Sequence, residues 1–269
     1  MPTYQQGRHE HGQNFLIDQT VVRSILDLVA TTSGEIIEVG PGDGAITRPL
    51  QQLQRPLTAI EIDSTLAVRL STRVGASVEV INADFLRYRL PDTPHVLVGN
   101  LPFHLTTAVL RHVLHAPGWT DAVFLVQWEV ARRRAGIGGA TLMTAQWSPW
   151  FTFELNRRVP AAAFRPRPTA DGGLLVLRRR TDPLLPVTDR TAFKGFTHRV
   201  FTGPGRGLAD VLHRAGAFTS TNGARGWLRS QRVAANAVPK NLSTGQWVDL
   251  YRATGTSPPG TTQPDHRRR

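Results

Sequence analysis

Residues 100–103, with the sequence Asn-Leu-Pro-Phe, carry the groups that an enzyme needs to hold an amino group conjugated to an aromatic ring. Such a nitrogen is a poor nucleophile because its lone pair is delocalised into the ring. The side-chain oxygen of Asn100 and the carbonyl of Leu101 or Pro102 could accept hydrogen bonds from its two N–H groups and favour a localised lone pair. Phe103 offers a face on which an extruded base could stack, worth about 1–3 kcal/mol per base. This tetrad predicts chemistry at an adenine N6.

An upstream segment has the glycines of a ligand-binding turn. Gly40, Gly42 and Gly44 lie between an expected strand and an expected helix, where glycine lets the backbone turn sharply and approach a ligand closely. The spacing is G-x-G-x-G, which differs from the G-x-G-x-x-G of dinucleotide binders, and no Lys-Ser or Lys-Thr pair follows as in a phosphate loop. We expect the adenosyl end of a methyl donor here. With the tetrad, this segment predicts methylation of an adenine N6 that requires no metal.

Two acidic residues stand where the next expected strands end. Glu61 is placed to accept hydrogen bonds from ribose hydroxyls, and Asp84 to accept one from an adenine amino group. Open parallel sheets bind ligands at the carboxyl ends of their strands. Each acid alone could be a solvated strand-end carboxylate, and the glycines alone an ordinary turn. The glycines and the two acids come at the ends of successive expected strands, and together they favour a donor site. The glycine spacing and the tetrad argue against NAD.

Phe164 lies in the segment Ala-Phe-Arg-Pro-Arg-Pro, where alternating prolines stiffen the chain. It could be a second stacking face for the base or a core residue on a rigid loop, and both interpretations stay open. The tetrad alone could likewise be a turn with Phe103 packed in the core. It gains its functional interpretation because it follows a fourth expected strand downstream of the donor site.

The chain has 269 residues, a net charge of +12 and a sequence pI of about 11.4. This excess of positive charge predicts a polyanionic partner and favours nucleic acid. A membrane-surface protein would need a basic amphipathic helix, and the sequence offers no strong candidate. It has no cysteine, which excludes disulfides and thiolate metal sites. Because no signal peptide or membrane-length apolar stretch is evident, we expect a cytoplasmic protein that is not associated with a membrane.

The pattern of short apolar strands alternating with helices predicts an α/β fold with a largely parallel, doubly wound, Rossmann-like sheet. The expected strands are 35–39, 57–62, 78–81, 95–99, 122–128, 150–159 and 173–177. The expected helices in this region are 20–30, 45–53, 64–74 and 105–115, with Ser64 as an N-cap.

The composition and the pattern of the sequence change after residue 180. A Pro-rich stretch is followed by four expected helices, the first capped by Thr188 and stopped by Gly203-Pro204. We expect a mobile arm over 1–12, a methyltransferase domain over 13–180, a small helical RNA-associated domain over 181–253 and a disordered basic tail over 254–269.

These residues and their order resemble the rRNA adenine N6-methyltransferases, a family that includes the Erm macrolide-resistance enzymes and the small-subunit adenine dimethyltransferases. Gly12–Leu16 looks like the family's opening motif, and Glu38–Gly44, Glu61, Asp84, the tetrad and Phe164–Pro168 look like its later motifs. The resemblance implies S-adenosylmethionine as donor and a flipped rRNA adenosine as acceptor. The donor-binding residues that it implies are Gln13, Asn14, Leu16, Glu38, Gly40, Gly42, Gly44, Glu61, Ile62, Asp84, Phe85 and Asn100.

Within the family, Arg132–Gly136 and the segment after it resemble the actinobacterial Erm enzymes. That branch modifies one adenosine in the peptidyl-transferase loop of 23S rRNA and causes resistance to macrolides, lincosamides and streptogramin B. Two alternatives stay open: a small-subunit dimethyltransferase for ribosome maturation, and a non-catalytic nucleic-acid-binding relative. The chain departs from the family pattern at Phe103, where many members have Tyr, and at Ala170 and Gly172, where Val and Ser are common.

Arginines cluster near the expected pocket and predict contacts with RNA phosphates. The expected RNA-binding residues are Arg132, Arg133, Arg134, Arg165 and Arg167. The run Arg178–Arg180 is expected to form a solvated face instead. We expect the protein to act on 23S rRNA as a monomer.

Overall fold

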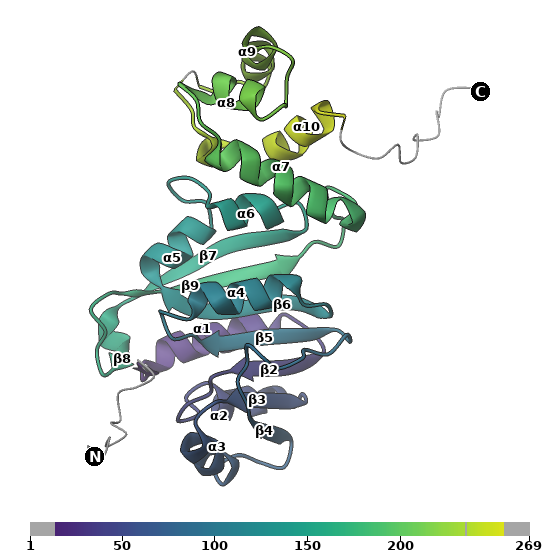
Figure 1. Ribbon diagram of the computed structural model, residues 1–269. Coiled ribbons are helices and arrows are strands. Elements are labelled where there is room, and N and C mark those ends of the chain that lie inside the picture. Colours follow the sequence, from purple (N-terminus) through teal and green to yellow (C-terminus); the bar gives the residue numbers. More distant parts are fainter. Residues whose placement is uncertain (1–13, 235, 256–269) are drawn as a thin grey trace, which may run out of the picture. The chain divides into compact units, whose positions relative to one another are not determined.

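The computed structural model describes residues 14–234 and 236–255 (Figure 1). Its centre is a seven-stranded sheet in the order β4-β3-β2-β5-β6-β9-β7. The strands are β2 (Glu35–Val39), β3 (Leu57–Glu61), β4 (Val78–Asn82), β5 (His95–Asn100), β6 (Trp119–Gln127), β7 (Phe151–Val159) and β9 (Gly172–Arg179). The run from β4 to β6 is parallel, and β9 is antiparallel to β6. The predicted Rossmann-like α/β fold is confirmed.

The register of the parallel strands brings their carboxyl ends to one edge of the sheet. Ile36 of β2 lies opposite Leu57 of β3 and Val96 of β5. These three side chains are at most 2% exposed, because a parallel sheet with helices on both faces buries its strands almost completely. The loops after β2, β3, β4 and β5 therefore open at the same edge.

Helices cover both faces of this sheet, with α1 on one side and α4 on the other (Figure 1). The helix α1 (Gln19–Ala30) is capped by Asp18, whose carboxylate accepts hydrogen bonds from the amides of Thr20 and Val21. Its residues Val21, Val22, Ile25 and Val29 are buried. The other helices of this region are α2 (Thr47–Leu50), α3 (Ser64–Ser71), α4 (Thr106–His115) and α5 (Trp128–Arg134).

The helix α5 was not expected from the sequence, and α2 and α3 differ from the expectation. Pro49 lacks an amide donor and is best tolerated in a first helical turn, so α2 begins only at Thr47 and ends at Leu50, followed by a 3₁₀ turn over Gln51–Leu53. The expected N-cap Ser64 is wrong by one residue: the Asp63 carboxylate accepts from the amides of Thr65 and Leu66 and caps α3. A carboxylate is the stronger acceptor for the positive end of a helix.

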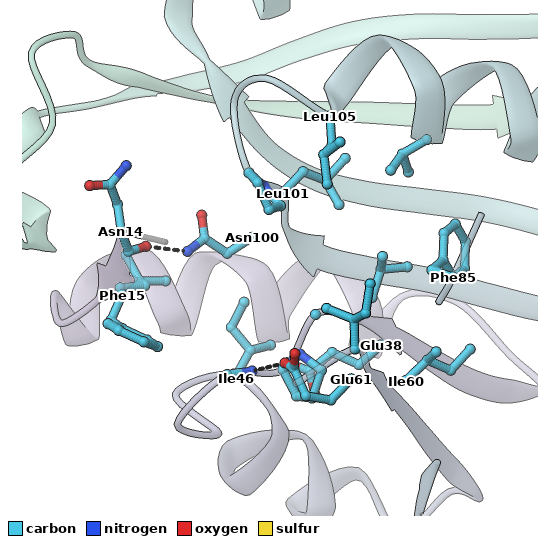
Figure 2. Close-up of a pocket in the computed structure, with 18 of the residues that line it drawn as sticks. Asn14, Phe15, Glu38, Ile46, Ile60, Glu61, Phe85, Asn100, Leu101 and Leu105 are labelled. Carbon is cyan, nitrogen blue, oxygen red and sulfur yellow. Dashed lines mark hydrogen bonds between the residues drawn. The ribbon is translucent and has the colours of Figure 1, made fainter. Parts of the chain in front are cut away.

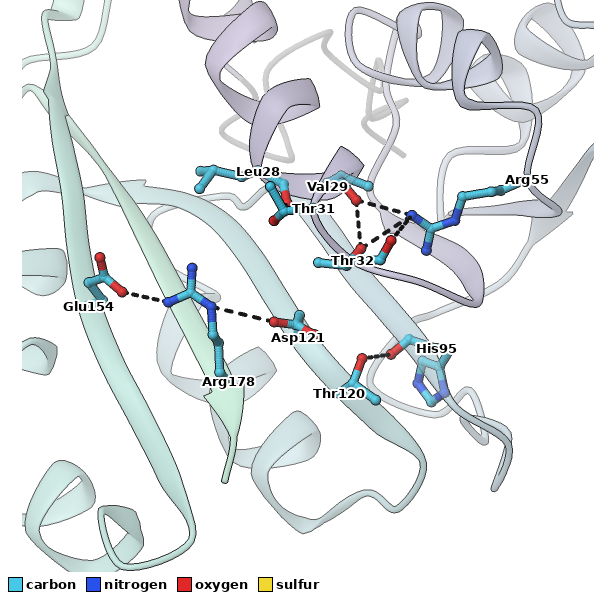
Figure 3. Close-up of polar contacts among 10 residues, drawn as sticks. All are labelled: Leu28, Val29, Thr31, Thr32, Arg55, His95, Thr120, Asp121, Glu154 and Arg178. Carbon is cyan, nitrogen blue, oxygen red and sulfur yellow. Dashed lines mark hydrogen bonds and ion pairs between the residues drawn. The ribbon is translucent and has the colours of Figure 1, made fainter. Parts of the chain in front are cut away.

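Two polar networks join elements that are distant in sequence (Figure 3). Arg55 donates to the carbonyls of Val29, Thr32 and Gly34, with N–O distances of 3.0, 3.2 and 2.6 Å. It satisfies carbonyls in the last turn of α1 and in the segment after it, where helix ends leave acceptors unpaired. Arg178 of β9 pairs with Asp121 of β6 and Glu154 of β7. Both partners are within reach because β9 lies between β6 and β7 in the sheet. Arg178 is therefore not part of a merely solvated face.

A second, two-stranded ribbon was not expected from the sequence. The strand β1 (Phe15–Leu16) pairs antiparallel with β8 (Phe164–Arg165), with Leu16 opposite Phe164. The ribbon continues through the amide of Ile17, which donates to the carbonyl of Ala163 at 2.8 Å. Strands of two residues carry no readable alternation pattern, so only the folded chain reveals this pairing.

The described chain divides into two compact units: one formed by residues up to Ala135 together with Thr152–Arg179, the other by Gly136–Phe151 together with residues from Arg180 onward. The helices of the second unit are α6 (Leu142–Trp147), α7 (Arg190–Thr202), α8 (Leu208–Arg214), α9 (Thr221–Ser230) and α10 (Thr244–Ala253). Phe193 and Phe196 of α7 pack against Tyr251 of α10 at ring-centroid distances of 5.3 and 5.7 Å. Thr188 does not cap α7, because a 3₁₀ turn over Val187–Asp189 precedes the helix.

Among the described residues, no helix has both the length and the apolar character needed to span a bilayer.

We expect Arg55→Met to lower the free energy of unfolding by about 1–3 kcal/mol, because it leaves carbonyls at and after the end of α1 without their charged donor. Urea unfolding followed by circular dichroism measures this loss. Arg73→Met is the matched control, since Arg73 is exposed after α3. Equal effects of the two substitutions would contradict the proposed contribution of Arg55.

Candidate active site

A cavity opens at the edge of the sheet where the parallel strands end (Figure 2). Its wall combines residues of β1 with the loops after β2, β3, β4 and β5. The predicted donor-binding residues that line it are Asn14, Leu16, Glu38, Gly40, Gly42, Glu61, Ile62, Asp84, Phe85 and Asn100. All four residues of the tetrad, Asn100–Phe103, also line it. One cavity thus holds both predicted sets of residues.

Three of the predicted donor-binding and catalytic residues are missing from this lining. Gln13 lies outside the described residues. Gly44 faces away: an added Cβ would come within 2.6 Å of the Leu70 side chain, and its φ of +79° favours glycine. The requirement at Gly44 is therefore close packing of the loop against α3. Phe164 packs in the hydrophobic core.

The glycine loop is held by Glu61. The Glu61 carboxylate accepts from the amide of Gly42 at 3.0 Å and from the amide of Asp63 at 2.9 Å, although the side chain is only 1% exposed. Gly42 has a φ of +56°, and an added Cβ would lie 3.0 Å from the Phe15 ring. Gly40 has a φ of +65° with open space at its Cβ position. The loop is thus fixed at Gly42 and leaves room at Gly40.

Glu38 is a buried carboxyl group at the end of β2. Its Oε2 atom has no hydrogen-bond partner among the described residues. Burial raises the pKa of Glu38 to about 8, and the Glu61 carboxylate adds to the rise while Thr47 opposes it. At neutral pH Glu38 is therefore mostly protonated, with an unused polar atom in the cavity wall.

Asp84 and Phe85 form the wall after β4. One oxygen of Asp84 accepts from the amide of Leu86 at 2.9 Å, and the other lies 3.8 Å from the guanidinium of Arg87. Phe85 is 6% exposed and meets His112 edge-on at a centroid distance of 5.2 Å. The turn at Asp84 is thereby fixed, and its second oxygen keeps capacity for another donor.

The tetrad begins at the last residue of β5. The Leu101 amide donates to the carbonyl of Leu125 in β6 at 2.9 Å, and the Pro102 carbonyl accepts from the amide of Leu105 at 2.9 Å. The Asn100 side-chain amide donates from Nδ2 to the carbonyl of Asn14 at 2.7 Å (Figure 2). The tetrad is therefore held on both sides by backbone contacts.

Phe164 supports Phe103 in this conformation and is not itself part of the cavity wall. The two rings meet edge-on, with centroids 6.4 Å apart. Phe164 is 2% exposed and belongs to the hydrophobic core, whereas Phe103 is half-buried and lines the cavity. Stacking of a base on Phe164 stays a prediction that would require this segment to move.

The predicted RNA-binding arginines have different environments. Arg132 pairs with Glu129 at 3.2 Å, and Arg134 donates to Thr107 at 3.3 Å. Burial lowers the pKa of Arg134, and the nearby Arg111 and Arg133 lower it further. The arginines with exposed side chains are Arg133, Arg165 and Arg167.

Part of the apolar wall of the cavity was not predicted from the sequence. Phe15, Ile46, Ile60, Leu105 and Val109 also line it. Ile60 belongs to a buried strand and Val109 to a helix face, so their apolar character was already explained by the core. Only the position of Phe15, inside the opening motif, could have indicated it.

We expect Glu38→Gln to stabilise the ligand-free protein more at pH 8 than at pH 5. The folded protein keeps the Glu38 proton up to about pH 8, whereas the ordinary pKa is 4.5. Glu38 therefore favours folding most below pH 4.5 and loses this contribution as the pH rises to about 8. Urea unfolding gives the free energy of unfolding of the variant minus that of the wild type, and this difference should be about 2–4 kcal/mol larger at pH 8 than at pH 5. A difference that does not change with pH would contradict the raised pKa.

Comparison with known proteins agrees with this geometry. A family model described as "Ribosomal RNA adenine dimethylase" matches residues 4–254. An rRNA adenine N-6-methyltransferase from Corynebacterium diphtheriae is 59% identical over 219 residues, which cover 81% of this chain and 87% of that protein. The mycinamicin-resistance protein MyrB of Micromonospora griseorubida is 43% identical, with 96% of this chain and 87% of that protein covered.

The crystal structure of the 23S rRNA methyltransferase ErmE is similar over 90% of this chain and 100% of that one, with 31% sequence identity and a TM-score of 0.82. The similarity therefore extends over both compact units. The family resemblance inferred from the sequence motifs is confirmed: the chain belongs to the ribosomal RNA adenine dimethylase family.

Proposed function

We propose that this protein transfers methyl groups from S-adenosylmethionine to the N6 of one adenosine in the peptidyl-transferase loop of 23S rRNA. Its expression would then cause resistance to macrolides, lincosamides and streptogramin B. The observation that carries the proposal is the single cavity shared by the glycine loop and the tetrad. The names of the relatives, one a 23S rRNA methyltransferase and one a mycinamicin-resistance protein, support the choice of RNA and the resistance.

The donor half of the cavity has the groups that S-adenosylmethionine requires. Gly40 leaves open space beside the backbone, Glu61 has carboxylate lone pairs for ribose hydroxyls, and Asp84 has an oxygen for an adenine amino group. The unpartnered Glu38 oxygen supports a polar ligand against this wall. When bound, S-adenosylmethionine would supply a methyl group attached to a positively charged sulfur. The neutral thioether that remains after transfer is a good leaving group.

The acceptor half is the tetrad. Asn100 Oδ1 and the Leu101 carbonyl are the two acceptors that we assign to the N6 hydrogens. The Pro102 carbonyl is a weaker choice, because it already accepts from the Leu105 amide and the Thr106 hydroxyl. Phe103, supported edge-on by Phe164, provides the stacking face. Catalysis then rests on alignment of N6 and on preorganised acceptors, and the flipped base is held away from its duplex.

The rRNA backbone would be held by exposed arginines of the predicted RNA-binding set. Arg133, Arg165 and Arg167 have exposed side chains and can reach phosphates, while Arg132 and Arg134 are partly engaged within the protein. The second compact unit carries additional positive charge on α9, where Arg225 and Arg229 are exposed. We assign both regions to electrostatic binding of RNA, which is sensitive to salt.

We expect expression in a macrolide-sensitive bacterium to add methyl groups to one adenosine of 23S rRNA and to raise the inhibitory concentration of erythromycin at least tenfold. Mass spectrometry of rRNA fragments from expressing and non-expressing cells measures the modification. An Asn100→Ala variant expressed to the same level is the control. Methylation of 16S rRNA alone would favour the small-subunit enzyme, and no methylation of either RNA would favour a non-catalytic relative.

We expect Glu61→Gln to weaken binding of S-adenosylmethionine at least tenfold, about 1.4 kcal/mol. The amide removes the negative charge and turns an NH₂ group toward one of the two backbone N–H donors of Gly42 and Asp63. Isothermal titration calorimetry measures the affinity. Glu79→Gln is the matched control because Glu79 is exposed on the neighbouring strand β4. Unchanged affinity of Glu61→Gln would remove Glu61 from the donor site.

A further inference from the structure

We propose that the backbone carbonyl of Asn14 is a positioning group for the reaction, because it fixes which end of the Asn100 amide faces the substrate. The proposal rests on the proposed function and adds a role for the ribbon formed by β1 and β8. Its starting observation is the 2.7 Å hydrogen bond from Asn100 Nδ2 to the Asn14 carbonyl, between residues 86 positions apart in the sequence. Figure 2 shows this bond between Asn14, directly before β1, and Asn100 at the end of β5.

The contact can form with only one orientation of the side chain. A backbone carbonyl is an acceptor only, so the Asn100 NH₂ group must face it. Rotation of the amide by half a turn would bring two oxygen atoms together at the same distance of 2.7 Å, without a proton between them. The Asn14 carbonyl therefore holds Oδ1 on the opposite side, where it can accept a hydrogen bond from N6. A reversed amide would offer the N6 group a donor where it needs an acceptor.

The β1–β8 ribbon holds the Asn14 carbonyl in place. Asn14 directly precedes β1, and β1 is paired with β8. The Ile17 amide donates to the Ala163 carbonyl at 2.8 Å, which extends this pairing by one residue. The side chain of Leu16, which lies opposite Phe164, is 4% exposed and packs in the core. The carbonyl is thus positioned by a strand pair, and a free chain end would not hold it in the same way.

Asp171 anchors the other end of the ribbon. Its carboxylate accepts from the amide of Ala161 at 2.8 Å and from Arg158 at 2.7 Å, and its own carbonyl accepts from the amide of Trp128 at 2.8 Å. These contacts fix the segment that leads into β8. Because Phe164 of β8 also supports Phe103, the same ribbon contacts both the stacking residue and, through Asn14, the acceptor residue of the tetrad.

The first test uses Asn100→Asp, in which only the protonated side chain can donate to Asn14 while its carbonyl accepts from N6. We divide the single-turnover rate of Asn100→Asp by the wild-type rate at the same pH. We expect this ratio to be at least tenfold higher at pH 5.5 than at pH 8.5. The ratio corrects for the other titratable groups that line the cavity, Glu38, Glu61, Asp84 and His104. A ratio that stays constant or rises with pH overturns the proposal, since an ionised carboxylate is the stronger acceptor for N6.

The second test removes the support of the carbonyl. Ile17→Pro eliminates the amide that bonds to Ala163, and Ile17→Ala is the matched control that keeps this amide; Ile17 is exposed and does not line the cavity. At saturating S-adenosylmethionine and with enzyme in excess over RNA, so that slow residual transfer can be followed, we expect Ile17→Pro to lower the single-turnover rate at least tenfold in the wild-type background. In the Asn100→Ala background we expect it to lower the residual rate less than twofold. Ile17→Ala should stay within twofold of wild type.

This double-mutant cycle separates positioning from a general structural effect. Equal losses in both backgrounds overturn the proposal, because the ribbon would then act independently of Asn100. If Ile17→Pro does not fold, as judged by thermal melting, Asp171→Ala replaces it in the same cycle with the same criterion. A wild-type protein that methylates no rRNA would instead refute the proposed function, so the two failures can be distinguished.

Discussion

Parallel pairing of β2 with β3 and β5 is the constraint on which the site depends. It fixes Glu38 opposite Ala59 and Val98 and brings the loops that follow these strands to one edge. Because the strands are buried on both faces, a one-residue slip would exchange the side chains that pack against the two helix layers and would displace the acids at the strand ends. The cost of such a shift keeps groups from four different loops in one cavity, and no single loop could position them.

Buried polar contacts refine what the sheet places approximately. Glu61 joins the glycine loop to the turn after β3 through two backbone amides, and Asn100 joins β5 to the segment before β1. Each contact leaves an oxygen with capacity for a ligand hydrogen. Glu38 is the exception, since its burial leaves one atom unpartnered among the described residues and raises its pKa to about 8. We infer that part of the folding stability is sacrificed for a polar wall.

Sequence reasoning predicted the strands around the site because apolar runs bounded by glycines and acids leave few alternatives. The expected strand 35–39 coincides with β2 (Glu35–Val39). The β1–β8 ribbon and the hydrogen bond of Asn100 to Asn14 were not predicted from the sequence. Two-residue strands have no period to recognise, and a contact made by a backbone carbonyl leaves no trace in residue type. Phe164 shows a further limit: the sequence could not separate a core aromatic from a stacking face, and in the structure it is 2% exposed.

The central claim is that N6 of an adenosine lies between the Asn100 side chain and the backbone of the tetrad, in line with the methyl donor. A crystal structure of the protein with S-adenosylhomocysteine and adenosine tests it most directly. The account predicts that N6 lies within hydrogen-bond distance of Asn100 Oδ1 and the Leu101 carbonyl, with the base stacked on Phe103. An adenine bound elsewhere, or an Asn100 side chain turned away from the sulfur of the bound cosubstrate, would contradict it.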